Sequence, residues 1–147
     1  MKPTDIVEFF LVAVEENSFG KAEEMVTPDF EATGYKSDPI DIKEFLKIFR
    51  ALTTGLSNFR LNYEVMKEIS GNVDVTTEIL GRHTKDMPSL LNGMQPIPAT
   101  DLPVRLPVEH IHFTVRDQQI AKLHLQHTPG GGIQGLLKQL GVDSTPG

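Results

Sequence analysis

The hydrophobic and polar residues follow two periods, which divide the chain into a helical first part and a strand-rich second part. Near the N-terminus, apolar residues recur at helical spacing after Thr4, which we expect to cap a first helix. These residues are Ile6, Phe9, Phe10, Ala13 and Val14. A short second helix is expected at residues 18–25, and a short strand at residues 29–35.

The helix that follows Asp41 has the clearest signals. The segment Asp41-Ile-Lys-Glu44 resembles a capping box, in which a side chain at the helix start accepts a hydrogen bond from a first-turn N–H. An apolar stripe follows and ends near Gly55, formed by Ile42, Phe45, Leu46, Phe49 and Leu52. This pattern predicts an amphipathic helix with one buried face.

From Asn58 the period changes to two, which is typical of strands with one buried face. We expect two long antiparallel strands joined by a turn at Gly71-Asn72, the second with Val73, Val75, Thr77, Ile79, Gly81 and His83 on one face. Residues 87–103 are rich in proline and yet apolar, which suits an irregular loop that acts as a lid. A hairpin over residues 104–127, turning at Asp117-Gln118, precedes a glycine hinge and a closing helix before Gly141.

The order of elements, helices first and strands afterwards, predicts an α+β fold with helices on one side of an antiparallel sheet. We interpret residues 1–147 as a single domain, because a chain of this length buries roughly 70% of its unfolded surface.

Composition excludes several classes of protein. The net charge is −6, and no cluster of basic residues is present, so nucleic acid and anionic membranes are not expected partners. The chain has no cysteine, which excludes disulfides, thiolate metal sites and a cysteine nucleophile. The N-terminus carries no signal-peptide pattern or membrane span, and we expect a cytoplasmic protein.

Four stretches resemble one known family: Gly81-Arg-His83-Thr84, Pro98-Ala-Thr100 with the later Pro103-to-Pro107 passage, Phe113 to Ile120, and Leu136 to Gly141. Together they are similar to the SnoaL-like polyketide cyclases, within the nuclear transport factor 2-like superfamily. The resemblance implies a cone-shaped barrel, in which a curved antiparallel sheet wraps N-terminal helices and a short helix closes the chain. It also implies cofactor-free aldol chemistry.

The sequence departs from that family's pattern at several positions. Gln118 replaces the hairpin glycine, His124 replaces a tryptophan, and residues 120–128 contain no acidic residue where the family's cyclases use an aspartate. The absent aspartate favours a non-catalytic protein, and a catalyst would need two other titratable groups.

We predict that Glu109 and His124 form this pair. Placing Arg116 opposite Gln119 pairs Ile111 with His124 on one sheet face and puts Glu109 diagonally beside the histidine. Burial would raise the pKa of Glu109. A structural pair, or a solvated face, remains the alternative, and a slip of one residue would separate the two side chains.

Four further residues are candidate ligand contacts: His83, Gln126, Tyr35 and Tyr63. For His83 the alternatives are a place at the pocket mouth or a hydrogen bond to the loop, and for the tyrosines a ligand contact or simple core packing. In the register above, the opposite face carries His110, His112 and His127. We expect it to form a homodimer contact, and we expect neither a metal nor a cofactor.

The predicted function is a cofactor-independent cyclase or isomerase that acts by proton transfer on an apolar carbonyl compound. The alternative is a non-catalytic module that binds a small apolar organic ligand or another protein. No phosphate-binding loop, Gly-x-Ser-x-Gly elbow or His-Glu-x-x-His motif is present.

Overall fold

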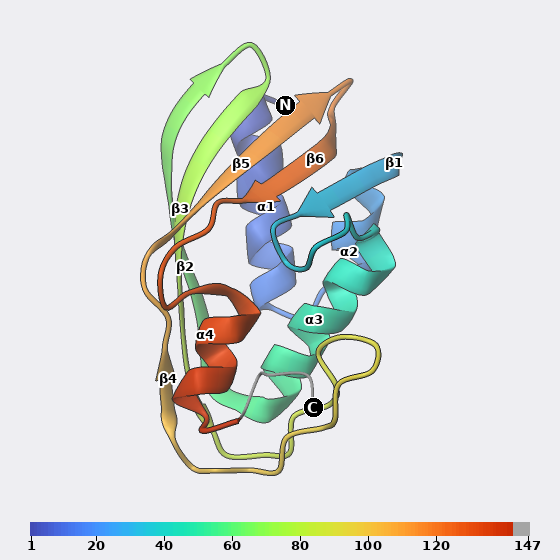
Figure 1. Ribbon diagram of the computed structural model, residues 1–147. Coiled ribbons are helices and arrows are strands. Elements are labelled where there is room, and N and C mark those ends of the chain that lie inside the picture. Colours follow the sequence, from blue (N-terminus) through green and yellow to red (C-terminus); the bar gives the residue numbers. More distant parts are fainter. Residues whose placement is uncertain (143–147) are drawn as a thin grey trace.

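In the computed structural model, which describes residues 1–142, a curved six-stranded sheet wraps around helices (Figure 1). The elements in chain order are α1 (Pro3–Glu15), α2 (Phe19–Glu24), β1 (Val26–Thr33), α3 (Ile42–Gly55), β2 (Leu56–Ile69), β3 (Asn72–His83), β4 (Pro103–Arg105), β5 (Glu109–Arg116), β6 (Gln119–Leu125) and α4 (Gly132–Gln139). The predicted α+β class and the order of elements are confirmed.

The sheet has the strand order β1-β6-β5-β3-β2, and β4 pairs with the end of β3. Neighbouring strands are antiparallel except for β1 and β6, which run parallel. The expectation of a wholly antiparallel sheet is therefore wrong at this edge. The pair joins strands that are far apart in the sequence, so no tight turn fixes their direction.

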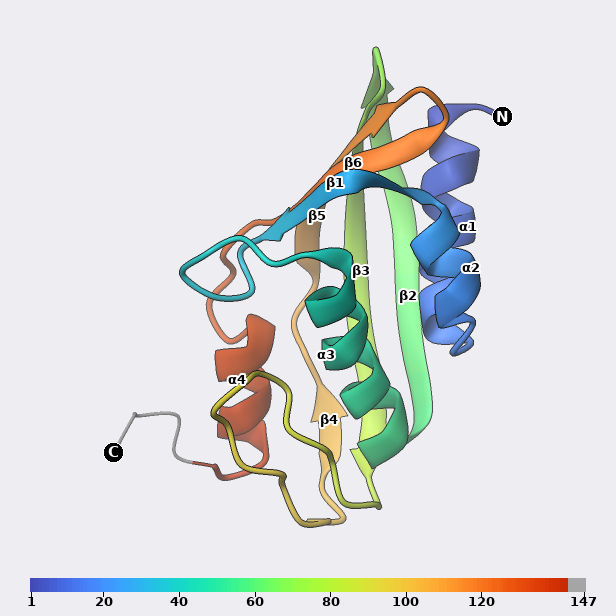
Figure 2. The same cartoon turned by 90° about the vertical axis from the view of Figure 1, so that its right-hand side faces the viewer.

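The core lies between the inner face of the sheet and helices α1 and α3 (Figure 2). Helix α3 begins as predicted, because Asp41 Oδ1 accepts a hydrogen bond from the N–H of Glu44 at 2.9 Å. Phe45 lies at the centre of an aromatic cluster with Phe10, Phe30 and Phe49. The predicted stripe on this helix thus faces the core.

Helix α1 differs from the prediction in two respects. It begins at Pro3, so Lys2 and not Thr4 is the N-cap, and the N–H of Lys2 donates to Asp5 Oδ2. Phe9 is 59% exposed, because the buried stripe runs along the opposite side of the helix. That stripe consists of Ile6, Val7, Phe10, Leu11, Ala13 and Val14.

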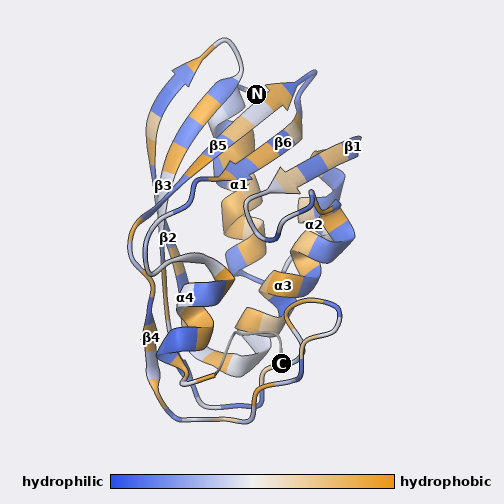
Figure 3. Ribbon diagram, in the orientation of Figure 1, coloured by the Kyte–Doolittle hydropathy of each residue, from blue (hydrophilic) through white to orange (hydrophobic). Residues whose placement is uncertain are grey.

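The predicted hairpin of β2 and β3 is present, with its turn at Ser70-Gly71, one residue earlier than expected. The inner face of β3 is buried as predicted at Val73, Val75, Thr77, Ile79 and His83. Apolar and polar residues alternate along β3 and β5 (Figure 3).

The hairpin of β5 and β6 turns at Asp117-Gln118 as predicted, but its register does not follow the prediction. Val115 pairs with Ile120, and beyond that point a β-bulge leaves Ala121 without a partner on β5. The pairs that follow are Thr114–Lys122, Phe113–Leu123, His112–His124 and Ile111–Leu125. The predicted pairs of Phe113 with Lys122 and of Ile111 with His124 are wrong, because the extra residue shifts the strand by one position.

Residues 88–102 contain no helix or strand, and an isolated bridge joins Met87 to Ile97. The apolar side chains of Met87, Leu90 and Ile97 are buried. No helix in the described part of the chain is long and apolar enough to cross a membrane.

Candidate ligand pocket

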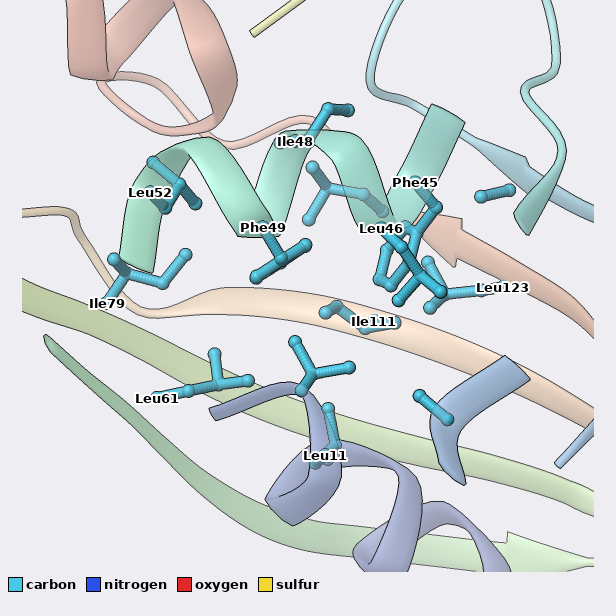
Figure 4. Packing of buried hydrophobic residues seen from close by; sticks show 14 of the residues in the cluster. Leu11, Phe45, Leu46, Ile48, Phe49, Leu52, Leu61, Ile79, Ile111 and Leu123 are labelled. Carbon is cyan, nitrogen blue, oxygen red and sulfur yellow. The ribbon is translucent and has the colours of Figure 1, made fainter. Parts of the chain in front are cut away.

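A small cavity lies inside the molecule, between the inner sheet face and helices α1, α3 and α4. Side chains from α1, α3 and the strands point toward one another around it (Figure 4). Its lining is almost entirely hydrocarbon: Leu11, Val14, Phe45, Ile48, Phe49, Leu52, Leu61, Ile79, Leu90, Leu106, Ile111, Leu123, Leu125, Ile133 and Leu136. The cavity has a volume of about 40 Å³, so it holds no more than a few water-sized molecules.

Glu109 is the ionisable carboxyl in this lining. It is the first residue of β5 and is only 3% exposed. The alternation of the strand turns it to the same inner side as Ile111 and Phe113, and its partner across the sheet is the buried Thr77. The predicted burial of Glu109 is confirmed.

The carboxyl of Glu109 contacts the start of helix α4. Its Oε2 accepts a hydrogen bond from the N–H of Gly132 at 3.0 Å, and no other hydrogen bond to this carboxyl occurs within residues 1–142. Burial raises the pKa of Glu109, and the Gly132 N–H opposes that shift to a smaller extent because it stabilises the charged form. This carboxyl therefore keeps its proton to a higher pH than an exposed glutamate.

Tyr35, which follows β1, also lines the cavity. Its ring packs edge-on against Phe45, with centroids 5.6 Å apart. Burial and, second, the charge of Glu109 raise the pKa of Tyr35, so its hydroxyl stays protonated and remains a donor.

His124 does not join Glu109 in the cavity. It lies exposed on the outer face of the sheet, where its Nδ1 is 2.7 Å from Thr33 Oγ1. The bulge at Ala121 places Glu109 and His124 on opposite faces, so the predicted acid/base pair is not assembled. A signal for this register is visible in the sequence, because polar Lys122 and His124 alternate with apolar Leu123 and Leu125.

Gln126 and Tyr63 also lie outside the cavity. Gln126 is exposed on the outer face, and its backbone N–H donates to the carbonyl of His110. Tyr63 is half-buried, and its pKa is raised by burial and by the nearby charges of Glu8 and Glu15 on α1. The structure therefore favours the packing alternative for Tyr63.

His83 is fully buried but does not line the cavity. Its Nδ1 lies 2.9 Å from Thr100 Oγ1 and accepts a hydrogen bond from the Thr100 N–H. Of the two alternatives for His83, the structure therefore supports the hydrogen bond to the loop over a place at the pocket mouth. Its Nε2 is buried and has no hydrogen-bond partner among residues 1–142.

The outer face carries His110, His112 and His124. His112 lies between two side chains, with Nδ1 2.6 Å from Asp74 Oδ1 and Nε2 3.2 Å from Asn72 Oδ1. Within the described residues, no three side chains of the metal-binding types come together to form a site.

Sequence reasoning did not identify Thr77 or the backbone of Gly132 as part of the site. The glycine run before α4 was interpreted only as a hinge, because a backbone N–H leaves no signal in the sequence.

No protein-family model and no curated protein matches this sequence. Solved structures do match over nearly the whole chain. IdmH from Streptomyces antibioticus, a candidate polyketide cyclase, is 17% identical, with 97% of this chain and 100% of that chain covered and a TM-score of 0.70. AclR from Streptomyces galilaeus, a candidate hydroxylase, is 14% identical, with 95% of each chain covered and a TM-score of 0.70.

A SnoaL-like polyketide cyclase from Agrobacterium tumefaciens is 12% identical, with 86% of this chain and 91% of that chain covered and a TM-score of 0.61. The chain thus has the α+β cone fold of the SnoaL-like polyketide cyclases, as its sequence motifs predict. At these identities the similarity concerns the fold.

Proposed function

We propose that this protein binds a small, largely apolar organic molecule in the cavity and that Glu109 is the polar anchor for that molecule. The observation that carries the proposal is a carboxyl, 3% exposed, within an otherwise hydrocarbon lining. Ligand sites commonly combine apolar walls with a few placed polar groups. In its protonated form this carboxyl both donates and accepts hydrogen bonds, which suits a neutral carbonyl or hydroxyl, and in its charged form it repels an anion.

The size of the cavity bears on how a ligand enters. Pockets for organic ligands commonly measure roughly 300 to 1,000 Å³, and this cavity measures about 40 Å³. A ligand must therefore widen it. The loop at residues 87–103 contributes Leu90 to the lining, and α4 contributes Ile133 and Leu136, so these two segments are the ones that would move.

A matched pair of probes tests the binding proposal. We expect 2-acetonaphthone, a neutral ketone, to shift the amide signals of Leu125, Gly132 and Ile133 in an NMR titration, and 2-naphthoate, an anion of similar size, to leave them unchanged. Glu109→Leu should abolish the response to the ketone. Equal binding of the two probes, or a ketone response that survives in Glu109→Leu, would refute the role of Glu109.

A second candidate function is cofactor-independent proton transfer on an apolar carbonyl compound, as in a cyclase or isomerase. It is favoured by the raised pKa of Glu109 and by Tyr35, which lines the same cavity and keeps its hydroxyl protonated. Ionised Glu109 would take a proton from the carbon beside the carbonyl, and Tyr35 would donate a hydrogen bond to the resulting enolate oxygen. Glu109 would then return the proton to carbon, so one carboxyl replaces the predicted pair.

Deuterium incorporation tests this chemistry without knowledge of the product. In D2O, the wild type should accelerate exchange at the methyl group beside the carbonyl of 2-acetonaphthone, followed by NMR. Glu109→Gln should slow the catalysed exchange at least about 100-fold, the usual contribution of a general base. If the ketone binds but exchanges at the same rate with either protein, the role is binding alone.

A homodimer through the outer face of the sheet is a separate proposal. Its support is the mixed character of that face, where exposed Met66 lies near His110, His112 and Gln126. Sedimentation should give a dimer for the wild type and a monomer for Met66→Glu. A wild type that stays monomeric at high concentration would contradict it. The cytoplasmic location stays a prediction.

A further inference from the structure

Gly131 is a glycine in a position where the backbone does not require one. Its φ and ψ of −100° and −173° are extended values that any residue adopts. Its neighbours differ, because Gly130 and Gly132 have φ of +80° and +66°, a region that favours glycine. The reason for glycine at position 131 therefore lies outside its own backbone.

The nearest neighbour is the carboxyl of Glu109. A Cβ at position 131 would lie 2.8 Å from Glu109 Oε2 and 3.0 Å from Glu109 Cδ, with the carbonyl oxygen of Thr128 next at 3.2 Å. The absent side chain lets the carboxyl reach the start of α4, where Oε2 accepts the Gly132 N–H at 3.0 Å. Oε1 accepts no hydrogen bond within the described residues.

Helix α4 is held against the sheet by two sets of contacts. Gln139 exchanges two hydrogen bonds with the backbone of Arg105, at 2.9 and 2.7 Å, and so ties the end of the helix to β4. Ile133 and Leu136 pack into the cavity. The Gly132 N–H is therefore fixed relative to the sheet only while α4 is docked.

We propose that Gly131 and the Gly132 N–H are positioning elements that hold Oε2 of Glu109 and leave Oε1 as the oxygen that meets the ligand. This inference rests on the proposed role of Glu109 as the polar group of the cavity. While α4 is docked, the hydrogen bond from the Gly132 N–H fixes the orientation of the carboxyl. When α4 is displaced, this hydrogen bond is lost and the carboxyl is free to rotate. Ligand entry past α4 is thereby coupled to the orientation of the group that receives the ligand.

The first test is the variant Gly131→Ala, with Gly20→Ala as its matched control, because a Cβ at Gly20 would meet nothing within 4 Å. In a titration of the Glu109 side-chain carboxyl by carbon NMR, Gly131→Ala should raise the pKa above the wild-type value. The variant loses a hydrogen bond to the charged form while the carboxyl stays in an apolar cavity. Gly20→Ala should leave the titration unchanged. A folded Gly131→Ala protein with the wild-type titration overturns the proposal.

A second variant covers the case in which Gly131→Ala does not fold. Glu109→Asp shortens the side chain by one methylene and withdraws the carboxyl from position 131. The double variant should therefore lose less stability from Gly131→Ala than the single variant does, in a double-mutant cycle read by thermal melting. Equal losses in the two backgrounds would show that Gly131 does not act through Glu109.

A measurement of ketone binding distinguishes a failure of this inference from a failure of the proposed function. Where the wild type binds 2-acetonaphthone, Gly131→Ala should weaken binding about tenfold, the effect of one misdirected hydrogen bond. Unchanged affinity would overturn the positioning role and leave the ligand site intact. If the wild type binds no ketone, the proposed function fails, whereas the titration and the cycle still decide whether Gly131 positions Glu109.

Discussion

The two faces of the β5–β6 hairpin differ sharply, although they belong to the same few residues. On the inner face, Leu123 is 1% exposed and Glu109 lies in the apolar cavity. On the outer face, His124 lies in solvent and contacts Thr33. A carboxyl in hydrocarbon has its pKa raised, so its surroundings, more than its residue type, mark Glu109 as the functional candidate.

The largest expected effect comes from placing a charge on the inner face. Leu123→Lys would bury an ammonium group without a partner, and we expect a loss of more than about 5 kcal/mol, enough to unfold a domain of ordinary stability. His124→Lys, one residue further along, should keep the wild-type melting temperature because its side chain points to solvent. Circular dichroism melts measure both variants. If Leu123→Lys melts at the wild-type temperature, residue 123 faces solvent, and the register predicted from the sequence, which has no bulge, is correct.

The next effect concerns two phenylalanines in helices. Phe49 is 4% exposed and lines the cavity, whereas Phe9 is 59% exposed. Phe49→Ala should cost about 3 to 5 kcal/mol of unfolding free energy, and Phe9→Ala should stay within about 0.5 kcal/mol of the wild type. Urea denaturation measures both. Similar losses for the two variants would mean that the faces of α1 and α3 are wrongly assigned.

Local sequence signals were sufficient for much of the fold. The cap at Asp41, the stripe of α3, the alternation of β3 and the turn at Asp117-Gln118 each depend on residues close in sequence, and each was predicted. The parallel pairing of β1 with β6 was not predicted, because it joins residues roughly 90 positions apart. The exposure of Phe9 was also missed, since Phe9 and Phe10 are both apolar and only packing distinguishes them.

The candidate site was predicted in part. The burial of Glu109 was expected, and Tyr35, a candidate ligand contact, lines the cavity beside it. The other candidates His124, Gln126 and Tyr63 lie outside the cavity. The bulge at Ala121 explains why His124 and Gln126 lie on the outer face, because the predicted register contains no extra residue. The alternation of polar and apolar residues at 122–125 indicates the observed register.

A smaller effect distinguishes the buried carboxyl by its pH dependence. Burial raises the pKa of Glu109 above its ordinary value of 4.5. As the pH rises from that value through the folded-state pKa, the unfolded chain releases this proton first, so the wild type loses stability across the window and then levels off. Glu109→Gln carries no such proton, and its stability relative to the wild type should rise with pH. The change is about 1.4 kcal/mol for each unit of pKa shift.

Thr77→Val is the control for this titration, because it changes the neighbour of Glu109 across the sheet without adding or removing an ionisable group. Its melting temperature relative to the wild type should show a much weaker dependence on pH than that of Glu109→Gln. The difference in stability between Glu109→Gln and the wild type could instead stay constant between pH 4 and pH 8. That result would show that the carboxyl is not desolvated, and the contrast between the two faces would lose its electrostatic basis.

The smallest expected effect lies on the outer face. His124→Gln removes the contact with Thr33, but both side chains are surface groups that water can satisfy. The free energy of unfolding should therefore change by less than about 0.5 kcal/mol. Ketone binding and deuterium exchange should match the wild type, because a side chain on the outer face does not reach the cavity. If His124→Gln slowed exchange as much as Glu109→Gln, the two residues would have to act on one substrate. The placement of the two side chains on opposite faces of the sheet would then be wrong.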